Sequence, residues 1–122
     1  MNYLCLVYFE PDALAGLSPG EHAELARESL GYDLDLRDRG HFIAAAALKP
    51  THAAATVRRR GGEFSITDGP FAETREILGG FIYIEARDLN EALRIAGDIP
   101  MARYGSIEVR PVQSFSPAGE RL

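Results

Sequence analysis

The fold of this chain is decided near its start, by the apolar run Tyr3-Leu4-Cys5-Leu6-Val7-Tyr8-Phe9. Glu10-Pro11-Asp12 ends the run, which is rich in aromatic, β-branched and leucine side chains, so it predicts a buried strand. The run Phe81-Ile82-Tyr83-Ile84-Glu85-Ala86, which follows Gly79-Gly80, predicts a second strand of the same kind. Both runs carry large apolar groups at odd and at even positions, so both faces of each strand need cover.

A long helix is predicted after the first strand. Ser18-Pro19-Gly20-Glu21 combines an N-cap serine, a proline suited to the first helical position and a glutamate that completes a capping box. Gly40 supplies a terminator, so the helix spans about residues 19–39. Gly31 inside it costs about 1 kcal/mol relative to alanine unless close packing requires a glycine. The expected buried stripe consists of Ala23, Ala26, Leu30 and Leu34.

A second helix is predicted from Asp88, because Glu91 completes another capping box and Pro100 ends the pattern. Its expected apolar stripe consists of Leu89, Ala92, Leu93, Ala96 and Ile99.

Shorter strands are predicted in the rest of the chain. Residues 41–48 favour a strand of small side chains, with a helix as the alternative. Residues 54–60 and 63–67 flank Gly61-Gly62, a dipeptide suited to a two-residue hairpin turn. Residues 106–112 predict the last strand. We expect one domain over residues 1–112, followed by a tail over 113–122 that is a loop or an extension that swaps onto a partner.

This order of elements predicts the α+β class. Strand, helix, strands, helix and strand form the βαββαβ pattern of the ferredoxin-like fold, an antiparallel sheet with two helices on one face. Two helices cover only one face of the sheet, whereas the strands over 3–9 and 81–86 are apolar on both. An uncovered apolar face usually marks an interface or a ligand groove. We therefore expect a homodimer whose sheets face each other, with any ligand pocket beside the interface.

Composition excludes several classes of partner. The chain has 122 residues, enough for one domain, and its net charge of −5 has the wrong sign for binding nucleic acid. The single cysteine, Cys5, cannot form a disulfide within the chain and is expected to be buried. No run approaches the roughly 20 apolar residues that cross a membrane, and residues 3–9 lack a basic leader and a cleavage site. We expect a cytoplasmic protein.

The most polar chemistry per residue lies in the stretch Thr67-Asp68-Gly69-Pro70-Phe71-Ala72-Glu73-Thr74-Arg75-Glu76. Asp68-Gly69-Pro70 favours a turn on physical grounds alone. Together with Gly79-Gly80-Phe81, the stretch resembles the signature of the DGPF proteins, the YCII-related domain family. The resemblance covers nearly the whole chain. It extends to Thr56-Val57-Arg58, Ala86-Arg87-Asp88-Leu89, Glu91-Ala92, Ile99-Pro100-Met101-Ala102-Arg103 and Val109-Arg110-Pro111.

The resemblance implies a dimeric α/β barrel of ferredoxin-like topology. It also implies enzymatic chemistry based on a histidine and aspartate pair, and an association of some members with extracytoplasmic-function sigma factors. His22 stands at the place of the family's histidine, early in the first helix after a proline. The family's acid stands directly before the proline that ends the second helix. Here Ile99 precedes Pro100, and Asp98 is one position early.

Three residues are candidate acid or base groups: His22, Asp68 and Glu73. A histidine has an ordinary pKa of about 6.5 and shuttles protons near neutral pH, and a desolvated carboxylate is a general base. The alternatives are a solvated histidine in the first helical turn, and a turn followed by a charged loop. The candidate ligand-binding residues are Phe71, Thr74, Arg75, Tyr83, Arg103 and Tyr104, with a plain core role as the alternative for Phe71 and Tyr83.

No metal or cofactor is expected. One cysteine and three scattered histidines lack metal-ligand spacing, and neither glycine pair fits a phosphate-binding loop. Arg58-Arg59-Arg60 favours a protected edge strand over a phosphate site.

Three hypotheses remain for the function. The first is a dimer that binds an organic molecule in an interface pocket and carries out cofactor-free proton transfer there. The second is an accessory domain that meets a sigma factor through an apolar patch outside the dimer interface. The third is a scaffold whose motif residues only make turns.

Overall fold

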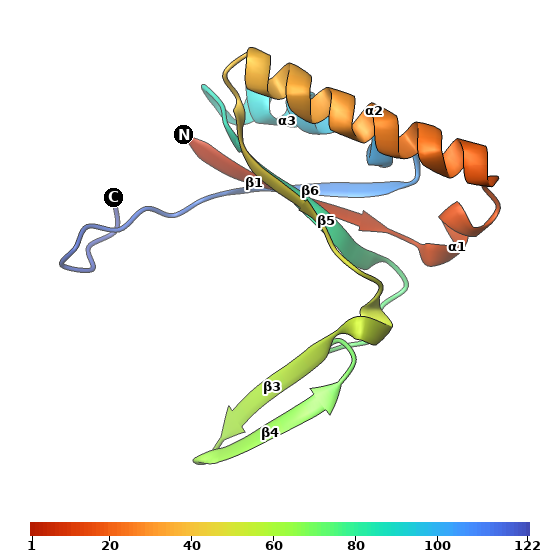
Figure 1. The fold of residues 1–122 in the computed structure, drawn as a ribbon. Helices are drawn as coiled ribbons and strands as arrows, with labels where there is room; N and C mark the ends of the chain where they lie inside the picture. The colour runs from red at the N-terminus through yellow and green to blue at the C-terminus, as the bar shows by residue number, and fades with distance from the viewer.

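The computed structural model describes all residues, 1–122, and consists of an antiparallel sheet, helices on one face of it and a separate hairpin (Figure 1). Its strands are β1 (Asn2–Phe9), β2 (Phe42–Ala47), β3 (Ala55–Arg60), β4 (Glu63–Asp68), β5 (Ile77–Glu85) and β6 (Gly105–Pro111). Its helices are α1 (Pro11–Ala15), α2 (Pro19–Asp38) and α3 (Leu89–Gly97), with 3₁₀ turns η1 (Thr51–Ala53) and η2 (Pro100–Arg103). No helix is long and apolar enough to span a membrane.

The four-stranded sheet has the order β2-β5-β1-β6, and every neighbouring pair is antiparallel. This confirms the α+β class and the expected antiparallel sheet with two long helices on one face. The strand β5 begins four residues earlier than predicted, because Gly79 and Gly80 lie within it rather than before it. A Cβ on Gly80 would lie 2.6 Å from the carbonyl oxygen of Ala46, so the glycine allows β2 to approach closely.

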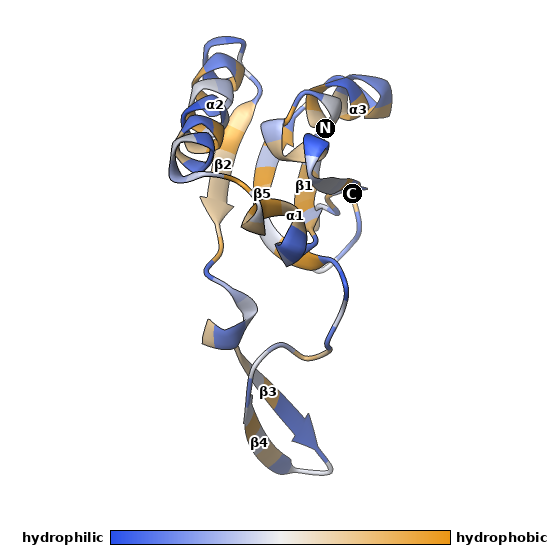
Figure 2. Cartoon of the chain, turned by 90° about the vertical axis from the view of Figure 1, so that its right-hand side faces the viewer, coloured by the Kyte–Doolittle hydropathy of each residue, from blue (hydrophilic) through white to orange (hydrophobic).

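The hydrophobic core lies between the sheet and the two helices. Tyr3, Cys5 and Val7 of β1 point to this inner face, and Ile82 and Ile84 of β5 join them. The core is completed from the helical side by Leu36, Ala92, Ile95, Ala96 and Ile99. The outer face carries Leu4, Leu6, Phe81 and Tyr83 in the alternate positions of the central strands, and the helices leave it uncovered (Figure 2).

The predicted buried stripe of α2 is wrong. Leu30 and Leu34 are 65% and 56% exposed, whereas Leu25 and Leu36 are buried. The buried stripe also includes the polar residue Tyr32, whose hydroxyl donates to the carbonyl oxygen of Ile95 at 2.7 Å. A stripe drawn from apolar residues alone misses Tyr32, which is partly buried against the core and whose polar group has a partner.

The stripe of α3 is right in part. Ala92, Ala96 and Ile99 are buried as expected, but Leu89 and Leu93 are exposed and Ile95 is buried in their place. The pitch of the helix allows only one of these overlapping apolar stripes to face the sheet.

Gly31 has no packing reason to be a glycine, since no atom lies within 4 Å of a Cβ built there. We expect Gly31→Ala to raise the free energy of unfolding by about 0.5–1 kcal/mol, because alanine has the higher helix propensity. Urea unfolding followed by circular dichroism measures the change. Gly40→Ala is the contrasting variant: Gly40 has φ +82°, so alanine there is expected to destabilise. A loss of stability in Gly31→Ala would show that the glycine serves a contact outside this chain.

The predicted hairpin forms, but outside the main sheet. Strands β3 and β4 pair only with each other and project away from the sheet and helices (Figures 1 and 2). Gly61 and Gly62, with φ of +56° and +82°, form the tight turn that their sequence predicted. The tail over 113–122 leaves β6 and folds back on itself through a bridge between Phe115 and Arg121.

Candidate functional site

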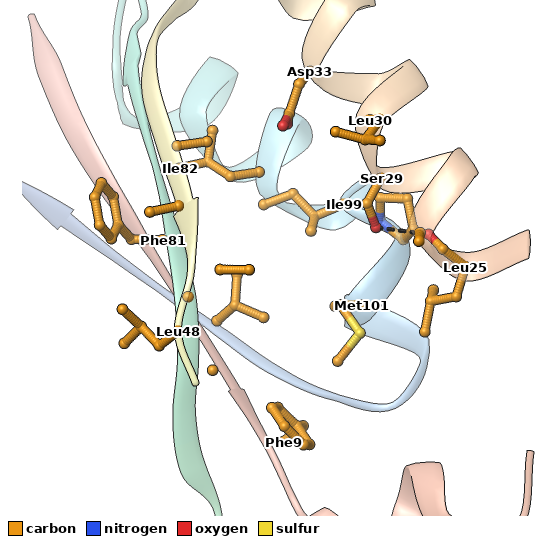
Figure 3. A pocket seen from close by; sticks show the side chains of 18 of the residues that line it. Phe9, Leu25, Ser29, Leu30, Asp33, Leu48, Phe81, Ile82, Ile99 and Met101 are labelled. Atoms are coloured by element: carbon orange, nitrogen blue, oxygen red, sulfur yellow. Dashed lines mark hydrogen bonds between the residues drawn. The ribbon is translucent and has the colours of Figure 1, made fainter. Parts of the chain in front are cut away.

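A cavity of about 560 Å³ lies between α2 and the inner face of the sheet. This volume is within the range of small-molecule sites. Side chains of α2 lie on one side of the cavity (Figure 3). On the other side lie Ile82 of β5, Ile99, which directly precedes η2, and Met101 within η2. The residues that α2 contributes are His22, Leu25, Ala26, Ser29, Leu30 and Asp33.

Asp33 is the unusual group of this cavity. It is partly buried in a mostly apolar lining, and its carboxylate has no hydrogen-bond or ion-pair partner within the chain and remains open to solvent. Burial raises the pKa of the Asp33 carboxyl, while the charge of Arg37 one turn away acts in the opposite direction. An acceptor without a partner in such surroundings is suited to bind a hydrogen-bond donor of a ligand.

His22 is the only other titratable residue that lines the cavity. It stands eleven residues before Asp33 on the same helix, a separation of about 16 Å along the axis. The two side chains therefore lie towards different ends of the cavity and do not form a hydrogen-bonded pair. Between them, the hydroxyl of Ser29 donates to the carbonyl oxygen of Leu25 at 2.9 Å, and its lone pairs remain available.

Asp98, the nearest match to the family's acid, lies elsewhere. It lines a polar cleft of about 160 Å³ with residues such as Tyr32, Arg39 and Glu91, and this cleft does not include His22. Ile99 takes the inward position and lines the cavity of His22. A shift of one residue at a helix end turns the side chain by about 100°, so the carboxylate faces away from the cavity.

The signature stretch forms the exit from the hairpin. Gly69 has φ +96°, and its amide donates to the carbonyl oxygen of Ala54 at 2.7 Å. Thr56 donates to the carbonyl oxygen of Gly69 at 2.8 Å, so the base of the hairpin is fixed from both strands. Asp68 is the last residue of β4, and its exposed side chain has no hydrogen-bond partner. These contacts support a turn-making role for Gly69 in particular.

Phe71 is 78% exposed, so the alternative of a plain core role for this residue is wrong. Together with Glu73 and Thr74, it lines a second, larger concavity of about 1270 Å³ between the base of the hairpin and the sheet. Thr74 also donates to the carbonyl oxygen of Glu76 at 2.5 Å.

The remaining candidate ligand residues are dispersed. Arg75 pairs with Glu10 at 3.2 Å on the surface. Tyr83 lies on the outer face of the sheet, where its hydroxyl accepts a hydrogen bond from Asn2 at 3.1 Å. Arg103 pairs with Glu28 at 2.8 Å and lies over the ring of its neighbour Tyr104.

Within one chain, the structure therefore does not assemble a single site from His22, Asp68 and Glu73. His22 lines the cavity beside α2, whereas Asp68 and Glu73 belong to the hairpin exit. Local sequence patterns do not show which side of the sheet a loop reaches. Asp33 was missed for a related reason: the available signal was its helical spacing from His22 and Ser29, whereas the predicted stripe considered only apolar residues.

Two further observations concern the cysteine and the clusters of metal-ligating side chains. Cys5 is fully buried, and burial raises its pKa to about 11, so it is not a thiolate nucleophile at neutral pH. No group of three or more histidine, cysteine, aspartate or glutamate residues is placed to hold a metal ion.

Comparisons with known proteins agree with the fold. The model of the YCII-related domain matches residues 1–116. An uncharacterised protein of Rhizobium meliloti (strain 1021) is 38% identical over 119 residues, which cover 96% of each chain. A solved structure of 5-chloro-2-hydroxyhydroquinone dehydrochlorinase from Burkholderia phenoliruptrix AC1100, in complex with 2,5-dihydroxybenzoquinone, superposes with a TM-score of 0.56. That match covers 98% of this chain and 100% of the other at 13% identity, so it shows similarity of fold.

Proposed function

The chain belongs to the YCII-related domain family, and from this premise we propose that it binds a small organic molecule in the cavity between α2 and the sheet. The observation that carries the proposal is the carboxylate of Asp33, which lines an apolar cavity, is partly buried and has no partner within the chain other than solvent. A ligand that donates a hydrogen bond to Asp33 and fills the apolar space satisfies both requirements of the cavity.

A hydroxylated ring is the ligand class that fits best. Its flat apolar body suits the lining of leucine, isoleucine, alanine and methionine, and its hydroxyl supplies the donor. The dehydrochlorinase with the similar fold binds a ring of this kind, 2,5-dihydroxybenzoquinone, which supports the class without fixing the molecule. Since burial raises the pKa of Asp33, this carboxylate is a stronger base than an ordinary aspartate. Proton transfer from a phenolic hydroxyl to Asp33 is the chemistry that we propose, with His22 as a second polar group at the other end.

Hydroquinone and 1,4-dimethoxybenzene test this proposal as a matched pair of probes. They share a ring, but only hydroquinone donates hydrogen bonds. We expect the wild type to bind hydroquinone more tightly, and Asp33→Asn to weaken that binding about tenfold while leaving the dimethoxy probe unchanged. Chemical-shift titration by NMR measures both affinities. Asp35→Asn is the control, since Asp35 lies on the same helix but pairs with Arg39 at 2.9 Å. Equal effects of the two variants, or equal binding of the two probes, would contradict the proposal.

Stability gives an independent readout of the same variant. The pKa of Asp33 is raised in the folded state, so the folded protein holds this proton more tightly than the unfolded chain does. The contribution of Asp33 to the stability of the fold therefore falls as the pH rises from the ordinary aspartate pKa of about 3.9 through the raised pKa of the folded state. Asp33→Asn removes this loss and is expected to melt at or above the wild-type temperature at pH 7, with the difference shrinking as the pH falls to 3. Weaker hydroquinone binding by a variant of full stability separates a binding role from a structural one.

We also propose that the protein is a homodimer in which the outer faces of two sheets pack together, as in a dimeric α/β barrel. The support is the apolar outer face formed by residues such as Leu4, Leu6, Phe81 and Tyr83, which no element of the chain covers. Glu73 lines a concavity together with Tyr8 of the outer face, so an acid or base role for Glu73 would operate beside this interface.

A second candidate function has its own observation. The hairpin carries exposed apolar side chains outside the sheet face, which is the feature expected of an accessory domain that meets a sigma factor. Copurification of an extracytoplasmic-function sigma factor with the wild type, and its loss on Ile66→Ser, would support this function over the first.

A further inference from the structure

The two neighbouring glycines of β5, Gly79 and Gly80, line the cavity between α2 and the sheet, and each is a glycine for a different reason. A Cβ on Gly80 would meet the backbone of β2, whereas the atoms nearest to a Cβ on Gly79 all belong to the ring of Phe9. Gly79 does not have a positive φ, so its backbone conformation is open to other residues. The ring of Phe9 is therefore what requires a glycine at position 79.

A β-bulge places Gly79 beside this ring. Val7 of β1 lies opposite Gly80, but the next residue, Tyr8, lies opposite Leu78, so Gly79 has no partner in β1. A Cβ on Gly79 would lie 2.7 Å from Cδ1 of Phe9 and closer still to Cε1. The ring thus occupies the space that a side chain at position 79 would take. Bulges redirect side chains and are frequent next to active sites.

Phe9 supplies a phenyl ring to the cavity lining. It is half-buried, so part of the ring remains open to the cavity. Phe81 also borders the cavity, but it lies opposite Leu6 on the outer face and its ring points away from the cavity (Figure 3). Phe9 is therefore the phenylalanine whose ring a ligand in the cavity can contact.

Asp33 and Phe9 lie at opposite ends of the cavity (Figure 3). The ring of Phe9 lies beside Gly79, which is three residues along β5 from Ile82, a separation on the order of 10 Å. A single ring whose hydroxyl binds Asp33 fills only a small part of about 560 Å³ and leaves the Phe9 end empty. The cavity therefore has room for a longer molecule.

We propose that the cavity takes a hydroxylated aromatic molecule with a second aromatic ring, whose hydroxyl binds Asp33 and whose second ring packs against Phe9. This inference rests on the proposed function and narrows its class of ligand. Two aromatic rings attract each other in offset-stacked or edge-to-face geometry beyond the effect of buried area, so Phe9 selects an aromatic ring over a saturated one. Gly79 is a positioning residue, since it acts through the ring of Phe9.

A matched pair of probes, 4-hydroxybiphenyl and 4-cyclohexylphenol, isolates the contact with Phe9. Both carry the same phenol for Asp33, and only the second ring differs, aromatic in one and saturated in the other. We expect the wild type to prefer 4-hydroxybiphenyl, and Phe9→Leu to lower the ratio of the two affinities about fivefold. Chemical-shift titration by NMR measures both affinities. Phe42→Leu is the control, since Phe42 packs against the same core but does not line the cavity, and its ratio is expected to equal that of the wild type.

Gly79→Ala tests the positioning role. The added Cβ displaces the ring of Phe9, so we expect the same ratio to fall, again by about fivefold. In the double variant Phe9→Leu/Gly79→Ala, the alanine is expected to change the ratio no further, because the ring on which it acts is absent. Additive effects of the two substitutions on the ratio would overturn the role of Gly79. Circular dichroism checks that each variant is folded, and Phe9→Leu tests the ring contact independently of Gly79→Ala.

Asp33→Asn separates this inference from the proposed function. If it leaves the affinities of both probes unchanged, the proposed function fails and the inference fails with it. If it weakens both probes, but Phe9→Leu keeps the wild-type ratio, the contact between Phe9 and a second ring is overturned alone. A wild type that binds hydroquinone as tightly as 4-hydroxybiphenyl also overturns that contact, because the second ring then contributes nothing.

Discussion

Leu36→Ala is expected to lower the free energy of unfolding by about 3–4 kcal/mol. Leu36 lies on the face of α2 that packs against the sheet and is fully buried there. It belongs to the same hydrophobic cluster as Tyr3, Ile84 and Ile95. Removal of its branched end loses the transfer free energy of the buried atoms and leaves a cavity that the surrounding β-sheet closes only in part. A domain of this size has a total stability of about 5–15 kcal/mol, so the loss is a large fraction. Urea unfolding followed by circular dichroism measures it.

Leu34→Ala is the matched control for this prediction. It makes the same chemical change two residues earlier on the same helix, at a side chain that is 56% exposed, and is expected to cost about 0.5 kcal/mol or less. The pair also identifies the face of α2 that packs on the sheet. A larger cost at Leu34 than at Leu36 would favour the stripe that the sequence predicted and contradict the structure.

Leu6→Lys is expected to dissociate the proposed homodimer, raising its dissociation constant by about 100-fold or more. Leu6 lies at the centre of the outer face, between Phe81 on β5 and Glu108 on β6. An ammonium group at this position in each copy would be brought into a desolvated interface, where the burial of a charge is costly and the carboxylate of Glu108 already pairs with Arg110 at 3.8 Å. In the monomer, the same group faces water, so the fold is expected to survive.

Size-exclusion chromatography with light scattering measures the oligomer, and circular dichroism checks the fold. Leu34→Lys introduces the same charge at an exposed position of α2 and is expected to leave the dimer intact. If Leu6→Lys and the wild type have the same mass at every concentration, the outer face is not the interface.

The sequence predicted the elements that depend on neighbours within a few residues. The capping box of α2 forms as expected: the amide of Glu21 donates to Ser18 at 3.1 Å, and the amide of Ser18 donates to Glu21 at 3.0 Å. Asp88 likewise caps α3 through the amide of Glu91 at 2.9 Å. The turn at Gly61-Gly62 also forms where positive φ angles were required. The signature stretch identified the family, which the match over residues 1–116 confirms.

The sequence predicted less of the candidate site than of the secondary structure. His22 was selected and does line a cavity, but its companion in that cavity is Asp33 rather than Asp98 or the carboxylates of the signature stretch. The choice among these acids depends on the rotation of two helices about their axes and on the side of the sheet that the hairpin exit reaches. Neither quantity is set by spacing along the chain, because several stripes on one helix are compatible with the same residues.

By itself, the sequence determined the two longer helices, the strands in outline, the antiparallel α+β class and the family of this protein, since caps, turn glycines and apolar alternation act over a few residues. Only the tertiary structure decided that Leu36 and not Leu34 is buried, that the hairpin of β3 and β4 stands apart from the sheet with Val57, Phe64 and Ile66 exposed, and that Asp33 lines an apolar cavity. The physical reason is that burial is settled by the packing of distant segments against one another, and each amphipathic element offers more than one face for that packing.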